Sequence, residues 1–179
     1  MAQGGEECDD GNIRAGDGCD VHCALEWPAF RADTVVAAPG DQGAESTTHN
    51  AQNAVNGVRG CGLYCGANDV FSLGFEKDRD NYVILRWEGR RVVNGPGADF
   101  VVFENAFEHR DGTTCFMDLL VVCVSTDGTD WACFPVDYLA ADETTYLPDP
   151  ALWAGFAGRR PVQLHIEENP VDPFDLATA

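Results

Sequence analysis

Acidic side chains that can bind a hard cation gather near the start of the chain. Ca²⁺ takes about six to eight oxygen ligands from flexible turns, and a divalent cation relieves the repulsion between clustered carboxylates. The spacing is not that of an EF-hand, because the fifth, sixth and twelfth positions counted from Asp10 are Arg14, Ala15 and Val21. We expect a calcium site of another geometry, or else an acidic knob without metal. Its candidate ligands are Asp9, Asp10, Asn12, Asp17 and Asp20.

A second pair of candidate metal ligands follows the apolar run at 99–105, Asp-Phe-Val-Val-Phe-Glu-Asn. Alternation puts apolar side chains on both faces of this run, which predicts a central strand buried on both sides. Glu104 and Asn105 stand at its exit, and a carboxylate beside a core needs a partner. A bound cation would supply that partner, and so would an arginine or a loop cap.

The sequence holds no recognisable catalytic template. Neither Gly-x-Ser-x-Gly nor His-Glu-x-x-His occurs, and no glycine-rich loop leads from a strand into a helix. A pair of carboxylates for glycoside hydrolysis is uninformative among 30 Asp and Glu residues. We therefore expect a protein that is not an enzyme, with an auxiliary or truncated part of a secreted hydrolase as the alternative.

Aromatic side chains are candidates for a sugar-binding platform. Trp87 and Trp131 lie in or beside predicted strands, so we expect both in the core. Tyr64 lies between Cys61 and Cys65, where a short disulfide loop would turn it outward, and it is the predicted ligand contact. The candidates considered are Trp27, Trp87, Trp131, Trp153, Tyr64 and Tyr138.

Eight cysteines in 179 residues indicate disulfides and an oxidising compartment. The close pairs have three intervening residues, which is not the spacing of a zinc knuckle or a redox motif. Cys123 and Cys133 flank the Asp127-Gly128 turn of a predicted hairpin, so they can face each other; Cys115 is the alternative partner for either. We expect Cys61–Cys65 and Cys123–Cys133 among the bridges of a set formed by Cys8, Cys19, Cys23, Cys61, Cys65, Cys115, Cys123 and Cys133.

The formal net charge of −19 excludes some partners. A surface this acidic repels phosphate backbones and anionic lipid, so we expect no nucleic-acid partner. No apolar run reaches the roughly 20 residues of a membrane span, so we expect no direct membrane insertion.

Residues 28–179 are predicted to be all-β. Short segments rich in Val, Phe and Tyr alternate with Gly, Pro and Asp turns, which favours a β-sandwich or jelly roll. Residues 1–27 have too few large apolar side chains for a core, and we expect them to form a separate disulfide-rich acidic domain. Residues 148–156 have room for one helical turn. The expected strands are 34–37, 70–75, 82–87, 91–93, 100–104, 119–125, 131–136 and 162–167.

Two parts of the chain resemble known families. Glu7-Cys8-Asp9-Asp10-Gly11-Asn12, then Gly16-Asp17-Gly18-Cys19 and Cys23, resemble the cysteine-rich repeat of myxobacterial-type surface proteins, although the cysteine that usually precedes this repeat is missing. The hairpin at 121–131 resembles that of discoidin-like and galactose-binding-like sandwiches, and 94–107 resembles a segment of bacterial cell-surface lipoproteins. Such chains usually continue past 169–175, so the resemblance implies part of a longer exported protein.

These observations predict an exported binding or adhesion module, stabilised by calcium and located outside the cell or on its surface. Its candidate ligands are carbohydrate and another surface protein. A structural subunit of a surface assembly is a further alternative.

Overall fold

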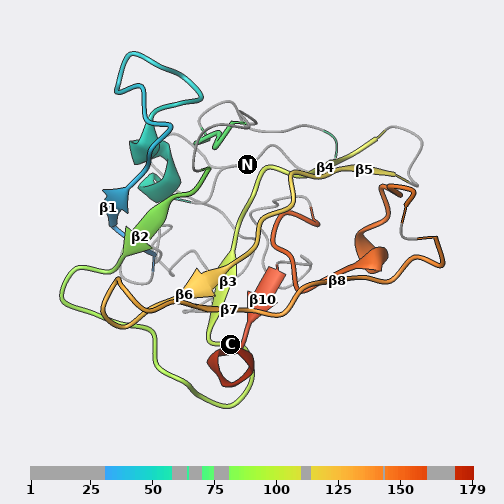
Figure 1. Cartoon of the computed structure of the whole chain (residues 1–179). Coiled ribbons are helices and arrows are strands. Elements are labelled where there is room, and N and C mark those ends of the chain that lie inside the picture. Colours follow the sequence, from blue (N-terminus) through green and yellow to red (C-terminus); the bar gives the residue numbers. More distant parts are fainter. Residues whose placement is uncertain are drawn as a thin grey trace, which may run out of the picture. The chain divides into compact units, whose positions relative to one another are not determined.

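The computed structural model describes residues 31–57, 64, 70–74, 81–109, 114–142, 144–160 and 172–179. Within these ranges the regular elements are β-strands and 3-10 helices, and the strands pair as five two-stranded antiparallel sheets (Figure 1). None of the helices described there is long and apolar enough to cross a membrane. The predicted all-β class is confirmed at this level.

The chain divides into two compact units. Unit 1 comprises Met1–Arg59, Ala67–Arg91 and Leu164–Glu168, and unit 2 comprises Gly60–Gly66, Val92–Gln163 and Asn169–Ala179. The predicted boundary after residue 27 lies outside the described residues.

Unit 1 is built on β1 (Thr34–Ala37) and β2 (Ile84–Arg86), which pair antiparallel with a bulge between Val35 and Ala37. Its 3-10 helix η2 (Ala51–Val55) begins where the Asn50 side chain accepts a hydrogen bond from the Gln52 N–H at 3.1 Å. The short carboxyl and amide side chains of this unit thus supply the caps that a turn-rich chain needs.

The core of unit 2 is a cluster of three phenylalanines. Strand β3 (Phe100–Val102) pairs with β10 (Asp172–Phe174), which sets Phe100 directly opposite Phe174. Their rings stack with centroids 5.4 Å apart, and Phe134 meets both rings edge-on at 5.8 and 4.9 Å. Phe134, Phe174 and Ala157 are buried, so the C-terminal segment completes the core.

The hairpin of β6 (Cys123–Val124) and β7 (Ala132–Cys133) carries Phe134 into this core. Cys123 and Cys133 lie opposite each other and form a disulfide, which confirms the predicted pair. In the turn, Ser125 Oγ accepts from the Gly128 N–H at 2.8 Å, and Gly128 has a positive φ of 78°. The Asp-Gly sequence therefore makes the turn that was predicted for it.

Unit 2 contains two further antiparallel strand pairs, one before the β6–β7 hairpin in the sequence and one after it. Strands β4 (Phe107–Glu108) and β5 (Cys115–Phe116) pair with each other, as do β8 (Asp137–Tyr138) and β9 (Trp153–Ala154). The 3-10 helix η3 (Pro150–Leu152) leads into β9 and matches the predicted helical turn. A last 3-10 helix, η5 (Leu176–Thr178), follows β10.

Several sequence-based expectations are corrected by this arrangement. The strand expected at 100–104 ends at Val102 and has one partner, β10, among the described residues, so it is not seen there as a central strand. Residues 70–74 and 91–93 are not strands, and 162–167 lie outside the described part. Trp131, expected in the core, is 43% exposed, because Phe134 takes the inward position. The described sheets have two strands each, and a sandwich is not visible in them.

Candidate functional site

Three aromatic side chains of unit 2 pack around Trp153. The Tyr138 ring stacks on Trp153 with centroids 4.0 Å apart, since these residues are direct partners in the β8–β9 pair. Tyr146 lies against Trp153 at 5.5 Å with its plane tilted by 39°, and Phe156 meets it edge-on at 5.8 Å. We call Tyr138, Tyr146, Trp153 and Phe156 the Trp153 cluster.

Hydrogen bonds fasten the loop before η3 to this cluster. The Trp153 Nε1–H donates to the Leu147 carbonyl at 2.9 Å. The Tyr138 hydroxyl donates to the Thr145 carbonyl and accepts from the Leu147 N–H at 3.0 Å. Both polar handles of the stacked pair are therefore used to position the backbone that carries Tyr146, which fixes the ring before any ligand arrives.

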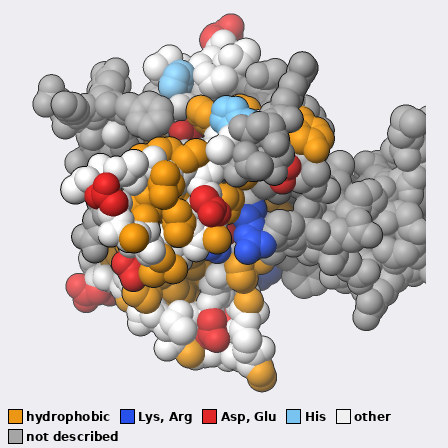
Figure 2. Space-filling model, turned by 90° about the vertical axis from the view of Figure 1, so that its right-hand side faces the viewer, with side chains coloured by type: hydrophobic (Ala, Val, Ile, Leu, Met, Phe, Trp, Pro, Cys, Tyr) orange, Lys and Arg blue, Asp and Glu red, His pale blue; other side chains and the backbone are white. Residues whose placement is uncertain are grey.

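Tyr146 is the most exposed ring of the cluster, with 55% of its surface accessible, and the adjacent Leu147 is 42% exposed. Figure 2 shows hydrophobic side chains gathered on the face turned toward the viewer, with carboxylates, Lys or Arg side chains and His side chains among them. Partial burial raises the pKa of the Tyr146 hydroxyl, and the nearby Asp118, Cys115 and Tyr138 raise it further. The Tyr146 ring is thus open to solvent, and the Asp118 carboxylate acts on its hydroxyl.

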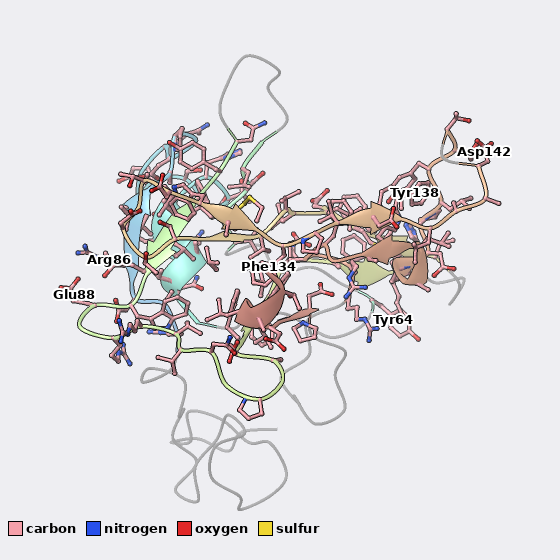
Figure 3. The ribbon with its side chains drawn as sticks, turned by 60° about the horizontal axis from the view of Figure 1, so that its bottom comes forward. Tyr64, Arg86, Glu88, Phe134, Tyr138 and Asp142 are labelled. Atoms are coloured by element: carbon pink, nitrogen blue, oxygen red, sulfur yellow. A yellow bond between two sulfur atoms is a disulfide. The ribbon has the colours of Figure 1, made fainter. Side chains whose placement is uncertain are left out.

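A fixed carboxylate stands on the loop that leads to Tyr146. Asp142 accepts hydrogen bonds from the Thr144 N–H and hydroxyl at 3.0 and 2.6 Å and from the Thr145 hydroxyl at 2.9 Å. These bonds lower the pKa of Asp142, the two from Thr144 most strongly, so it is ionised at neutral pH. Figure 3 shows Asp142 on the same arm of unit 2 as Tyr138, away from the core residue Phe134.

A second group of carboxylates surrounds Glu104. Its Oε2 atom is buried and has no hydrogen-bond partner. Burial raises the pKa of Glu104 to about 7 against the hydrogen bonds from the Asn105 and Ala106 N–H groups, with Asp118 and Asp172 adding repulsion. Burial likewise raises the pKa of Asp118. The predicted need for a partner at Glu104 is thus evident in its environment.

The arginine near these carboxylates serves Asp172 instead of Glu104. Arg159 Nη2 lies 2.9 Å from Asp172 Oδ1, its Nε–H donates to the same oxygen at 2.9 Å, and its backbone N–H donates to Oδ2 at 3.0 Å. Asp172 is 3% exposed. The described residues contain no group of three His, Cys, Asp or Glu that could hold an ion. The metal-binding role predicted for Glu104 and Asn105 stays a prediction.

Of the other predicted site residues, Tyr64 and Cys115 are among those that the structure describes. Tyr64 is 62% exposed, in agreement with the outward position expected for it. Cys115, expected among the disulfide cysteines, is a buried residue of β5. Tyr146 is not among the predicted contacts, because it lies outside the expected strands and outside the Cys61–Cys65 loop. The predicted calcium ligands Asp9, Asp10, Asn12, Asp17 and Asp20, and the cysteines Cys8, Cys19, Cys23, Cys61 and Cys65, lie outside the described residues.

The distribution of charge along the sequence is a signal that could have pointed to the Trp153 cluster. Between Arg110 and Arg159 there is no Lys, Arg or His. Because the Trp153 cluster lies inside this stretch, charge counted in windows along the chain would have marked it as an acidic, aromatic region. The acids of the stretch are Asp111, Asp118, Asp127, Asp130, Asp137, Asp142, Glu143 and Asp149.

Comparison of the chain with protein-family models, with curated proteins and with solved structures found no match.

Proposed function

We propose that this protein is an exported cell-surface module that recognises carbohydrate through the Trp153 cluster. The observation that carries the proposal is the exposed Tyr146 ring, held in place by a hydrogen-bonded stack of Tyr138 and Trp153. A rigid, solvent-exposed aromatic face is a surface on which the C–H face of a pyranose can pack.

The polar groups beside the ring suit the rest of a sugar. Asp142 is ionised and exposed, and the hydroxyls of Thr144 and Thr145 lie beside it. Carboxylates and hydroxyls are the acceptors and donors that sugar hydroxyls need. Since the loop is already fixed by the Tyr138 hydroxyl, little conformational entropy is lost on binding.

We also propose a location outside the cell or on its surface, and a β-sandwich or jelly-roll architecture. The Cys123–Cys133 disulfide and the total of eight cysteines support export. The resemblance to the cysteine-rich repeat and to surface lipoproteins supports attachment at a bacterial surface, with a β-sandwich or jelly roll as the architecture. Another surface protein is the alternative ligand.

Binding to a panel of soluble polysaccharides, measured by affinity electrophoresis or calorimetry, tests the function. Tyr146→Ala is expected to abolish retardation by the bound polysaccharide. Tyr82→Ala, a substitution of a 42% exposed tyrosine in unit 1, is the matched control and keeps binding. Tyr64→Ala tests whether Tyr64, and not Tyr146, is the ring that contacts the ligand. Loss of binding in Tyr64→Ala but not in Tyr146→Ala would move the site to residue 64.

Calcium at the N-terminal repeat is a separate proposal that rests on the sequence of residues 1–27. The segment has too few large apolar side chains to order itself, and a short disulfide loop contributes about 3 kcal/mol or less. A divalent cation held by Asp10, Asn12 and Asp17 would add to that stabilisation. Millimolar Ca²⁺ should protect this segment from protease, chelator should expose it, and Asp17→Ala should remove the protection. Identical cleavage in Ca²⁺ and chelator would rule the ion out.

One observation favours the hydrolase alternative. Glu104, with a pKa of about 7, carries its proton in the range where a general acid is needed, and Asp118 lies near it. The buried Glu104 Oε2 argues against this role, because a catalytic acid must reach its substrate. Turnover of a glycoside panel that Glu104→Gln abolishes would establish the enzyme.

A further inference from the structure

We propose that the ligand at Tyr146 is cationic, namely an oligosaccharide of amino sugars with free ammonium groups. This inference rests on the proposed function and narrows it from carbohydrate in general to one charge class. It is carried by the position of an exposed aromatic face within a long segment that contains acids and no bases.

The charge of the surrounding segment selects the sign of the ligand. From residue 111 to residue 158 the chain has no Lys, Arg or His; Arg159, which follows, is paired with Asp172, and the exposed Arg160 is the next base. Asp118 acts on the Tyr146 hydroxyl, and the whole chain has a net charge of −19, which favours a cationic ligand over an anionic one. Uronic acids and sulfated sugars are repelled by the same field.

The aromatic geometry provides a place for the ammonium group. Trp153 is covered by Tyr138, Tyr146 and Phe156, whereas Tyr146 remains 55% exposed. A cation attracted to a tyrosine face lies within about 6 Å of the ring centroid. Asp118 already acts electrostatically on the Tyr146 hydroxyl. A positive group over this ring would therefore gain from the ring and from the carboxylate.

Asp142 supplies a second attraction on the same arm. Its bonds to Thr144 and Thr145 keep it ionised and orient it, and it is exposed, so it can accept a further hydrogen bond from an ammonium group. An N-acetylated sugar has the same ring and the same hydroxyls but lacks this charge. The two sugars therefore differ in the positive charge of the amino group, which is the property that the site is proposed to recognise.

The test compares glucosamine oligomers, N-acetylglucosamine oligomers and galacturonate oligomers of equal length by calorimetry, at low and high salt. The full chain should bind the glucosamine oligomer about tenfold more tightly than its acetylated form, and high salt should narrow that ratio. Asp142→Asn should reduce the ratio of glucosamine to N-acetylglucosamine affinity to about threefold. Tyr146→Ala should lose all oligomers, and the Tyr82→Ala control should lose none.

The outcomes separate this inference from the function beneath it. Equal binding of the glucosamine and N-acetylglucosamine oligomers, or tighter binding of galacturonate, overturns the charge class and leaves carbohydrate recognition standing. Failure of every oligomer and polysaccharide to bind overturns both. An oligolysine peptide that binds the wild type but not Tyr146→Ala, with no sugar bound, shows that the site reads a cationic protein instead and also overturns the inference.

Discussion

Arg159 and Asp172 form a buried ion pair that ties β10 to the segment after β9. The guanidinium makes two contacts of 2.9 Å with one carboxylate oxygen, and the Arg159 backbone N–H holds the other oxygen. The Arg159 Nε–H also donates to the Phe156 carbonyl at 2.9 Å, which links the pair to the Trp153 cluster. Arg159 thus connects β10, through Asp172, with the backbone of Phe156 in the Trp153 cluster.

Asp172→Ala should destabilise the protein by about 3 kcal/mol or more, because it leaves a largely buried guanidinium without its carboxylate. Glu88→Ala is the matched control. It removes the Arg86–Glu88 pair, whose side chains are 59% and 67% exposed and which Figure 3 shows at the edge of unit 1. That loss should be below about 1 kcal/mol. Urea unfolding of both variants checks the difference, and equal losses would contradict it.

Replacing both Cys123 and Cys133 by Ser should lower stability by about 3 kcal/mol, because the bridge closes a loop of ten residues and removes that freedom from the unfolded chain. The measurement is thermal or urea unfolding under oxidising conditions. Reductant distinguishes this bridge from any other disulfide, because it should lower the stability of the double variant less than that of the wild type. A double variant as stable as the wild type would show that the hairpin needs no covalent link.

The hairpin was predictable because its signals are local. Asp127-Gly128, two flanking apolar runs and two cysteines at equal distance fix turn, register and bridge together. Strand β1 was also predictable from its β-branched run. Short strands such as β8 and β9 were not, because two residues carry no periodicity, and only their mutual packing through Tyr138 and Trp153 defines them.

Long-range pairing explains the remaining differences. The apolar run at 99–105 suggested a strand between two others, but its partner is β10, which lies about 70 residues later and contains a proline. Asp172 in that strand is buried only because Arg159 meets it. Glu104 was singled out correctly as a carboxylate beside a core, whereas the direction of Arg159 toward Asp172 depends on tertiary packing that no local pattern shows.

Gly158→Ala should cost markedly more than Gly97→Ala, although both glycines have positive φ, 83° and 85°. A methyl group at Gly158 would lie 2.4 Å from the Asp118 carbonyl oxygen and 3.1 Å from Glu104 Oε2, whereas at Gly97 nothing lies within 4 Å. The left-handed backbone accounts for about 1–2 kcal/mol at each position, and the clash at Gly158 adds about 1–3 kcal/mol. Chemical unfolding of the two variants isolates that added cost. Equal stabilities would mean that the backbone at 118 moves away freely.

Glu104→Gln should stabilise the protein above neutral pH and have little effect in mild acid. Burial raises the pKa of Glu104 from 4.5 to about 7 in the folded state, so the fold prefers the neutral side chain. Its contribution to stability is complete below about pH 4.5 and is lost as the pH rises through about 7. The glutamine variant stays neutral throughout.

The stability difference between Glu104→Gln and the wild type should therefore grow by about 2–3 kcal/mol between about pH 5 and about pH 8. Taking the difference cancels the titration of Asp127 and Asp142, whose lowered pKa values affect stability at lower pH. Chelator in all samples removes any contribution of bound cation, and Glu88→Gln, at an exposed position, is the control. A difference that stays constant from acid to alkali would show that Glu104 is ionised in the fold at no cost, with its Oε2 reached by water.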